Sequence, residues 1–365
     1  MTIDKINNKI NSSIENKIGI PTTTSEITSA WLENILSQKI PNSNITSIKI
    51  DNNFVSDGLL GKVARVMINY KEKNAGPKTV IVKFQISNSE KEREGEIYDL
   101  LSKAKVPYVP HIYGQFGNGN LVMEDLSLTH SVIEINQEFT TDQINNVVSM
   151  LSDVNSQFWS NSNIPKEHIL HFINSININM ENGWNIFKDR YQKDLGQNTV
   201  AFEWMWKNRE IVSSYYNSGL ATLTHGDVNR GNVLFSNDGN DEPKLIDWQL
   251  SGQKVLPFDL SYFMVQHLTV EQRRKHEDRL LKKYYQLLPD KIQSNYTFDH
   301  LLLDYRACTT RSMLSAVTAI GPMCSSRADQ FDRADTAAER IIAAIEDLKP
   351  IEAIQELQDR DLFKL

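Results

Sequence analysis

The chain has 365 residues, of which 40% are hydrophobic and 23% charged, and its formal net charge is -7. This composition predicts a soluble globular protein large enough for one large or two moderate domains. The acidic balance argues against a nucleic-acid partner, and no apolar run approaches the roughly 18–20 residues of a membrane span, so no membrane partner is expected either.

The cysteine content and the N-terminus bear on the cellular compartment. Cys308 and Cys324 are too few for a disulfide scaffold, and no Cys/His cluster has the spacing of a zinc site. The first 20 residues are polar and rich in Asn, with neither the apolar core of a signal peptide nor an Arg-rich transit pattern. We therefore expect a cytoplasmic protein, a monomer or homodimer, with a flexible segment over residues 1–20.

Residues 21–124 are predicted to form a small β-rich lobe that binds a nucleotide. The sequence TTTS at 22–25 offers N-cap residues for a helix that carries Trp31 and Ile35 on one face. A charged segment is predicted as a second helix over 89–101. Five runs are predicted as antiparallel strands: 45–50, 63–70, 79–84, 111–116 and 120–126.

Residues 125–365 are predicted to form a larger helical lobe for catalysis and substrate binding, after a hinge at 124–130. Helical periodicity covers 141–159, 200–216, 271–287, 298–319 and 328–347. The exception is 221–249, where two short strands are expected around loops. The predicted fold class is therefore α+β, with a small five-stranded antiparallel lobe before a larger helical lobe.

The strongest chemical signal is the segment HGDVNRGN at 225–232, followed fifteen residues after Asn232 by Asp247 in LIDWQ. An Asp and an Asn five residues apart on a loop, with a second Asp after an apolar strand, suit phosphoryl transfer. Asp227 can accept or orient the proton of an acceptor hydroxyl. Asn232 and Asp247 are hard oxygen ligands for Mg²⁺. Alone, the HGDVNRGN segment or the LIDWQ segment could be an ordinary turn. Both segments in this order favour a phosphoryl-transfer site.

The small lobe must then supply the nucleotide contacts. In the strand TVIVKF, alternation places Ile81 and Lys83 on one face, where Lys83 can reach phosphates and Ile81 can line an adenine slot. The alternative is a lysine on an exposed strand face. Glu94 in the following helix is the expected partner of Lys83, with Glu92 and Glu96 as competitors.

Two backbone elements complete the predicted nucleotide site. The turn that contains Gly58 and Gly61 could cover the phosphates with N–H groups, although two glycines usually mark only a turn. The 123–126 segment would present backbone groups of Glu124 and Leu126 to the adenine edge.

The segments LTHGDVNRGNVLF, LIDWQ and PFDLSYF resemble the aminoglycoside-phosphotransferase-type small-molecule kinases, and more closely the ecdysteroid-kinase-like or CHK-like branch. The resemblance covers roughly residues 25–345, and its specific part is 223–263. It implies a protein-kinase-like two-lobed fold, ATP or less often GTP as donor, Mg²⁺, and a hydroxyl on a small molecule as acceptor.

The same resemblance assigns roles to individual residues. It implies that Asp227 is the catalytic base, that Asn232 and Asp247 bind Mg²⁺, and that Lys83 holds phosphates with Glu94 as its partner. His225 would hold the loop by hydrogen bonds, and Asp259 would do so from the following helix. The glycine turn departs from the family pattern, and Arg230 stands one residue beyond the usual basic position. Two positions are therefore open for Arg230: a contact with the γ-phosphate, or a side chain that faces the solvent.

The sequence thus predicts an ATP/Mg²⁺-dependent kinase of a small hydroxylated metabolite, steroid-like or antibiotic-like molecule, with Lys83, Asp227, Asn232 and Asp247 serving one site. One alternative is a choline/ethanolamine-type or aminoglycoside kinase, which needs an acidic acceptor pocket. Another is a nucleotide-binding pseudokinase module. A protein kinase is disfavoured because the chain lacks the H-R-D, D-F-G and A-P-E segments.

Overall fold

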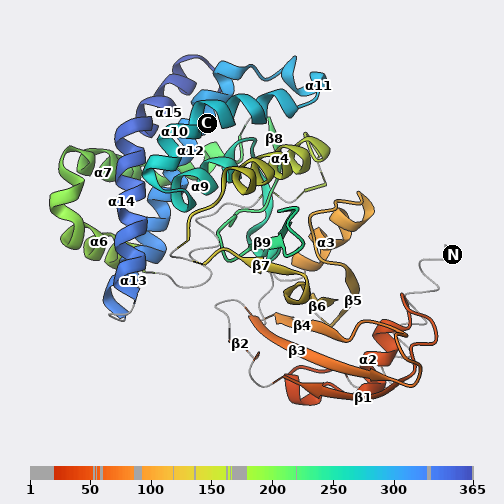
Figure 1. Cartoon of the computed structure of the whole chain (residues 1–365). Coiled ribbons are helices and arrows are strands. Elements are labelled where there is room, and N and C mark those ends of the chain that lie inside the picture. Colours follow the sequence, from red (N-terminus) through yellow and green to blue (C-terminus); the bar gives the residue numbers. More distant parts are fainter. Residues whose placement is uncertain are drawn as a thin grey trace. The chain divides into compact units, whose positions relative to one another are not determined.

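The computed structural model describes residues 20–363 apart from 52–53, 55, 58–60, 86–92, 118, 135–136, 162, 165, 167–178, 219 and 327–329 (Figure 1). The segment 1–19, on which the predicted flexible N-terminus falls, lies outside these residues. The chain divides into two compact units, an N-terminal unit (Met1–His130) and a C-terminal unit (Ser131–Leu365).

The N-terminal unit is built on one antiparallel sheet with the strand order β1-β3-β4-β6-β5. All five predicted strands are present, and the two-residue strand β2 also pairs with β3. The strands are β1 (Ile45–Ile50), β2 (Ser56–Asp57), β3 (Gly61–Tyr70), β4 (Thr79–Gln85), β5 (Ile112–Phe116) and β6 (Asn120–Glu124).

The first helix of this unit begins later than predicted. Helix α2 (Ser29–Leu36) has Thr28 as its N-cap, and the Thr28 side chain accepts a hydrogen bond from the Trp31 amide at 3.2 Å. The segment before it closes on itself as a 3₁₀ turn, η1 (Thr24–Glu26), because the Glu26 carboxylate accepts hydrogen bonds from the Thr22 backbone and hydroxyl. The predicted cap at 22–25 is therefore wrong.

The core of this unit lies between α2 and one face of the sheet. Trp31 and Ile35 of α2 pack in one apolar cluster with Val80, Val82 and Phe84 of β4. The predicted alternation along β4 is thus confirmed, and it places Lys83 on the opposite face of the strand. The second helix is α3 (Arg93–Lys103), followed after β6 by the 3₁₀ helix η3 (Leu126–Leu128).

The C-terminal unit is mainly helical, and helices lie over all five segments predicted from periodicity. The predicted helix at 200–216 is two helices that meet at Asn208, and the one at 298–319 runs into a π-helical stretch. The helices are α4 (Thr141–Gln157), α6 (Met180–Leu195), η4 (Gly196–Asn198), α7 (Thr199–Lys207), α8 (Arg209–Tyr216), η5 (Trp248–Leu250), α9 (Phe258–His267), α10 (Val270–Leu287), α11 (Asp290–Gln293), α12 (Phe298–Ser315), η6 (Ala316–Ile320), α13 (Gly321–Ser326), α14 (Phe331–Leu348) and α15 (Pro350–Asp359).

Two small sheets interrupt these helices, and three of their strands lie within 221–249, where two strands were predicted. β7 (His130–Val132), β9 (Val233–Ser236) and β10 (Pro243–Leu245) form one sheet with β9 in the centre. β8 (Ala221–Thr224) pairs with β11 (Gly252–Val255). Strands of three or four residues are too short for alternation to identify them, which is why the pattern predicted fewer.

Candidate active site

A hairpin in the C-terminal unit brings the two predicted metal-binding residues to the same end of a small sheet. β9 and β10 pair antiparallel, with Val233 opposite Leu245. Asn232 immediately precedes β9, and its carbonyl accepts a hydrogen bond from the Ile246 amide at 3.0 Å. Asp247 is the next residue. Strand pairing therefore brings Asn232 and Asp247 close together, although they are fifteen residues apart in the sequence.

The Asp227 carboxylate is held by three side-chain donors. Oδ1 accepts a hydrogen bond from the Tyr262 hydroxyl at 3.0 Å. Oδ2 accepts from the side-chain amides of Asn229 at 2.9 Å and Asn232 at 3.3 Å. Asn232 Nδ2 also donates to the Asp227 carbonyl at 3.0 Å. Asp227 and Asn232 are thus adjacent, as a base beside a metal ligand would be.

His225 uses both ring nitrogens within the protein. Its Nδ1 accepts a hydrogen bond from the Asp227 amide at 3.2 Å, so Nε2 carries the proton and donates to the Ile246 carbonyl at 2.8 Å. The ring is 1% exposed and packs edge-on against Trp248. The ring therefore links the segment before Asp227 to the segment before Asp247.

Helix α9 holds the 225–232 loop at three successive points. Near its N-terminus, the buried Asp259 carboxylate accepts hydrogen bonds from the backbone amides of His225 at 2.6 Å and Gly226 at 2.9 Å. Tyr262, one turn later, donates to Asp227. At the C-terminus of α9, the His267 carbonyl accepts from Arg230 Nη2 at 3.3 Å. The expected contact of Asp259 with the loop is confirmed, and burial raises the pKa of its carboxyl group.

The side chain of Arg230 contacts other parts of the C-terminal unit and does not simply face the solvent. Its guanidinium donates to the carbonyls of Glu134, Gln137 and His267, and lies 4.9 Å from the ring centroid of Phe139. Burial lowers the pKa of this arginine. Arg230 therefore links the loop to Glu134, Gln137 and Phe139 and to the end of α9.

The residues at the end of the β9–β10 hairpin fit a magnesium ion. Because Asn232 Nδ2 donates to Asp227, its Oδ1 is the atom that can face a cation, and Asp247 adds a carboxylate. Asp247 has a φ of 68°, in the left-handed region that a non-glycine residue adopts at a local energetic cost. Mg²⁺ usually takes one or two carboxylates and completes its shell with waters and substrate phosphates. In the described part of the chain, no group of three or more His, Cys, Asp or Glu residues forms a metal cluster.

The N-terminal unit brings together Lys83 and Glu94. Lys83 Nζ lies 2.8 Å from Glu94 Oε1, and the two residues are 7% and 2% exposed. Lys83 is in β4, and Glu94 is the second residue of α3. The ion pair therefore fixes the N-terminus of α3 against the strand that carries the lysine. Among the three glutamates weighed from the sequence, Glu92 lies outside the described residues.

Among the other residues predicted for nucleotide binding, Ile81, Gly61 and Glu124 lie in the same sheet, and Leu126 begins η3. Ile81 is half-buried in β4, and Gly61 begins β3 opposite Gln85. Gly58 lies outside the described residues. At the predicted hinge, the Glu124 amide donates to the His111 carbonyl at 2.8 Å, and the Leu126 carbonyl accepts from the Thr129 amide at 3.0 Å.

Tyr262 is a site residue that the sequence analysis missed. It lies in PFDLSYF, three residues after Asp259, and residues three apart share one face of a helix. Since Asp259 was expected to contact the loop, that spacing was the available signal for Tyr262.

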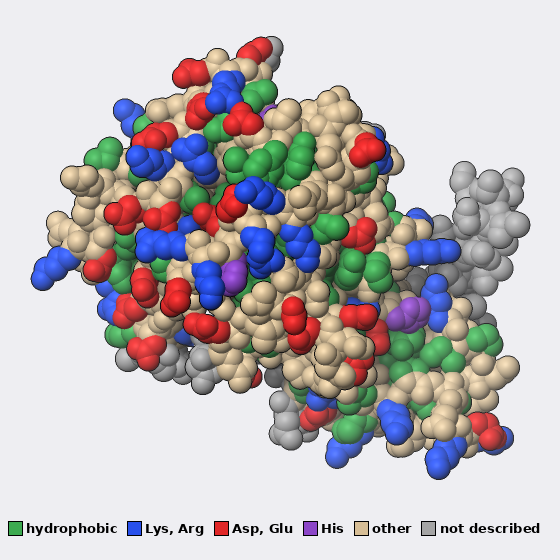
Figure 2. Space-filling view, turned by 45° about the horizontal axis from the view of Figure 1, so that its top comes forward, with side chains coloured by type: hydrophobic (Ala, Val, Ile, Leu, Met, Phe, Trp, Pro, Cys, Tyr) green, Lys and Arg blue, Asp and Glu red, His purple; other side chains and the backbone are tan. Residues whose placement is uncertain are grey.

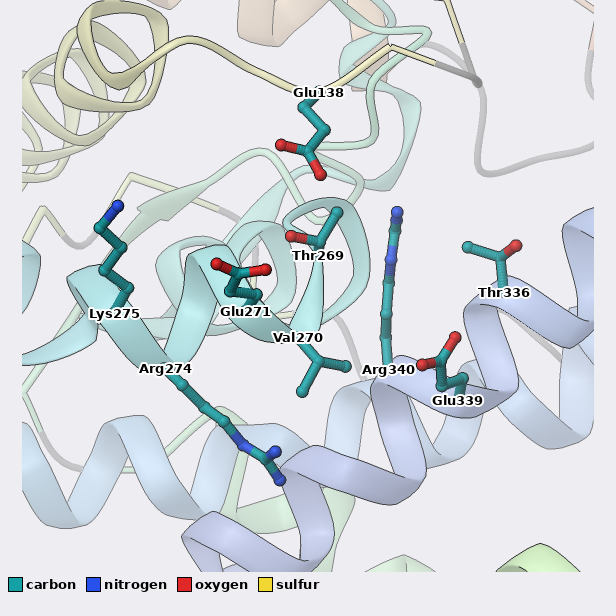
Figure 3. Close-up of a pocket in the computed structure, with 9 residues that line it drawn as sticks. All are labelled: Glu138, Thr269, Val270, Glu271, Arg274, Lys275, Thr336, Glu339 and Arg340. Carbon is teal, nitrogen blue, oxygen red and sulfur yellow. The ribbon is translucent and has the colours of Figure 1, made fainter.

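A separate pocket of about 890 Å³ lies in the C-terminal unit, and none of the predicted site residues lines it. Figure 3 shows the Arg340 side chain rising from α14 into this pocket, with Thr269 and Thr336 on either side. Arg340 Nη1 donates to the Gln266 carbonyl at 2.8 Å. Arg340 and Arg230 thus both donate to carbonyls at the C-terminal end of α9, where cations are favourable.

Two further features concern the charge of the surface and the character of the helices. On the face shown in Figure 2, Lys and Arg side chains are interspersed with Asp and Glu. No helix in the described part of the chain has the length and apolar character needed to cross a membrane.

The sheet of the N-terminal unit and the helices of the C-terminal unit define a protein-kinase-like fold. The family described as "DUF1679: Uncharacterized oxidoreductase dhs-27" matches residues 26–354. The chain therefore belongs to the DUF1679 family, which is the ecdysteroid-kinase-like family, and the resemblance seen in the motifs is confirmed. The activity in that description is said of dhs-27.

Solved structures of small-molecule kinases share the fold. The Plasmodium vivax ethanolamine kinase has a TM-score of 0.51 at 12% identity, over 91% of this chain and 92% of that one. A choline/ethanolamine kinase family protein from Mesorhizobium loti has a TM-score of 0.50 at 12% identity, over 90% and 98%. Among curated protein sequences, none matches this chain. At such identities the likeness establishes the fold alone.

Proposed function

We propose that this protein is an ATP- and Mg²⁺-dependent phosphotransferase that phosphorylates a hydroxyl group of a small molecule. The observation that carries the proposal is the arrangement of Asp227, Asn232 and Asp247. The Asp227 carboxylate is held by three donors, one of them Asn232, and strand pairing brings Asn232 and Asp247 to the same end of one hairpin. Phosphoryl transfer depends mainly on positioning and charge stabilisation, and this set supplies both.

Each residue has a distinct task in the proposed reaction. Asp227 orients the acceptor hydroxyl and takes its proton as the oxygen attacks the terminal phosphoryl group. Asn232 Oδ1 and the Asp247 carboxylate hold Mg²⁺, which when bound neutralises charge on the nucleotide phosphates. His225 keeps the segments that carry Asp227 and Asp247 in register.

Lys83 is proposed to bind the nucleotide phosphates. Support comes from its burial and from the ion pair with Glu94, which restricts the rotamers of a side chain that is otherwise flexible. On this proposal, the 21–124 segment binds the nucleotide, and the 125–365 segment supplies the catalytic and acceptor-binding residues. Binding of Mg²⁺-ATP should then depend on residues from both segments.

Thermal denaturation with millimolar Mg²⁺ and ATP or GTP tests nucleotide binding. A ligand that binds only the folded state stabilises it by about 2.7 kcal/mol at a hundred times its Kd. Lys83→Met and Asp247→Asn should each reduce the shift in Tm, whereas Lys71→Met, at an exposed lysine in the same unit, should leave it intact. Lack of any shift with either nucleotide would overturn the proposal.

Phosphoryl transfer itself needs a second measurement. Purified protein is incubated with Mg²⁺-ATP and a panel of hydroxylated metabolites, steroids, amino alcohols and aminoglycosides. A product that gains the mass of one phosphoryl group supports the kinase and identifies its acceptor. Nucleotide binding with no transfer to any acceptor would favour the pseudokinase module instead.

A further inference from the structure

Arg311 is a buried cation next to the 225–232 loop. It lies in α12 and is 6% exposed. Its Nη2 is 3.4 Å from the Gly226 carbonyl oxygen, and its Nη1 donates to the Ser315 hydroxyl. Among the described residues, Arg311 forms no ion pair, and its Nε is buried without a hydrogen-bond partner. A buried charge with so few partners is costly, so its position calls for an explanation.

Tyr262 connects this cation to Asp227. The guanidinium carbon of Arg311 lies 4.7 Å from the centroid of the Tyr262 ring, a cation–π distance. The hydroxyl of the same ring donates to Asp227 Oδ1 at 3.0 Å. The positive charge and the negative charge are thus separated by one phenol, with the ring face toward the cation and the hydroxyl toward the carboxylate.

Each oxygen of the Asp227 carboxylate is held from a different direction. Asn229 and Asn232, which belong to the loop itself, contact Oδ2. Tyr262 contacts Oδ1 from α9. Burial raises the pKa of the Tyr262 hydroxyl well above its ordinary value, so this group remains a donor at working pH. Removing it would leave one oxygen held and the other free, and the carboxylate could rotate about its Cβ–Cγ bond.

We infer that Tyr262 and Arg311 are positioning residues for the reaction, a pair that holds the Asp227 carboxylate in the orientation needed to accept the proton of the acceptor. The inference rests on the proposed function, because it assumes that Asp227 is the base. Tyr262 acts by its hydrogen bond. Arg311 acts by fixing the Tyr262 ring and the Gly226 carbonyl, the two groups that flank Asp227.

The inference predicts a separation between turnover and nucleotide binding. The proposed metal ligands are Asn232 and Asp247, so loss of Tyr262 or Arg311 should leave the KM for Mg²⁺-ATP nearly unchanged. Small errors in the position of a reacting group can cost about 10²-fold in rate. Tyr262→Phe, which keeps the ring and removes only the hydroxyl, should lower kcat by about tenfold to hundredfold. Arg311→Met should do the same, and Arg311→Lys should retain part of the activity.

The experiment uses Mg²⁺-ATP with water as the acceptor, so that it needs no identified substrate. Phosphate release is followed over hours for the wild type, Tyr262→Phe, Arg311→Met, Asp227→Asn and the double variant Tyr262→Phe/Asp227→Asn. Tyr305→Phe is the matched control, because its buried hydroxyl also donates to a carboxylate, but to Glu277 Oε1 at 2.7 Å and not to Asp227. Calorimetric binding of Mg²⁺-ATP is measured for each protein.

The double variant separates positioning from a structural role. If Tyr262 acts only through the Asp227 carboxylate, then Tyr262→Phe should cost nothing further once Asp227 is Asn, because the two effects are not additive. A residue that merely stabilised the fold would lower the rate in both backgrounds. Arg311→Lys replaces Arg311→Met in the comparison if the latter does not fold.

Different outcomes bear on the positioning role of Tyr262 and Arg311 and on the proposed kinase function. Full activity of Tyr262→Phe, an equal loss in the Asp227→Asn background, or wild-type hydrolysis no faster than that of Asp227→Asn would overturn the inference. Failure of the wild type to bind Mg²⁺-ATP would instead overturn the proposed function on which it rests. The expected result is slow hydrolysis by both single variants, unchanged nucleotide affinity and no additivity.

Discussion

The carbonyl oxygen of Leu250 lies 2.2 Å from the position that a Cβ atom would occupy on Gly226. Gly226 also has a φ of 85°, in the left-handed region that favours glycine. The backbone before Asp227 can therefore approach the segment after Asp247 this closely only because residue 226 lacks a side chain. This approach helps to bring the two acidic residues of the site together.

Replacing Gly226 by alanine should destabilise the protein strongly. The left-handed conformation and the clash with backbone act together, and we expect a loss of roughly 3–5 kcal/mol in the free energy of unfolding. Gly239→Ala is the matched control, since Gly239 has a φ of 88° but no atom within 4 Å of its Cβ position. It should lose only about 1–2 kcal/mol. Urea denaturation measures both, and equal losses would contradict the argument from close approach.

The ion pair between Lys83 and Glu94 should be strongly coupled. Removing one member of a buried pair leaves an uncompensated charge and typically costs about 3–5 kcal/mol. In a double-mutant cycle with Lys83→Met and Glu94→Gln, we therefore expect a coupling energy above about 1 kcal/mol. The pair Lys188–Glu203 has nearly the same distance, 2.7 Å, but its side chains are 36% and 53% exposed. Its coupling should stay below about 1 kcal/mol, and a larger value there than at Lys83 would refute the role of burial.

His267 should make the protein sensitive to acid. Burial, with Arg340 and Arg230 nearby, lowers the pKa of this imidazole in the folded state to about 3, from an ordinary value of 6.5. As the pH falls from 6.5 towards 3, the unfolded chain therefore binds a proton that the folded protein does not. The stability contribution is complete above pH 6.5 and is lost at about 1.4 kcal/mol per pH unit below it. His267→Phe should flatten the pH dependence of denaturation between pH 7 and 4, and an unchanged slope would count against it.

Asp227→Asn should separate chemistry from binding. The amide keeps the size of the side chain but loses its charge and almost all of its basicity. Loss of a general base costs about 10²–10⁴ in rate, so single-turnover phosphoryl transfer should slow at least a hundredfold. Calorimetric affinity for Mg²⁺-ATP should change little, because Asn232 and Asp247 are the proposed metal ligands. A variant that also loses nucleotide binding would identify Asp227 as a metal ligand or structural residue.

The large sheet and the long helices could be predicted because their signals are local. Each of the five strands of the sheet in the N-terminal unit alternates or is bounded by turn residues, and the helices repeat their apolar residues over three turns or more. The start of α2 was misplaced because Thr22 and Glu26 form their own closed turn, a contact that competes with helix capping. The strands β7 and β11 were not predicted because three or four residues carry too little pattern.

Hydrogen-bond partners on helices that are distant in the sequence could not be predicted from local patterns. The sequence motif shows that Asp227 and Asn232 share a loop, but not that Tyr262 contacts the carboxylate. Arg311 lies 84 residues after Asp227, and no motif connects the two positions. Its burial next to Gly226 depends on how α12 packs against α9, which the residues of α12 alone do not encode.

The three contacts between α9 and the 225–232 loop have a consequence for motion. Because Asp259, Tyr262 and the His267 carbonyl each hold a different part of the loop, the loop cannot detach without breaking contacts made by a buried helix. The loop and the helix then open together, as one cooperative unit, and the amides of His225 and Gly226 should exchange their hydrogens as slowly as those of α9. Any rearrangement that accompanies ligand entry or product release must accordingly be carried by other segments of the chain.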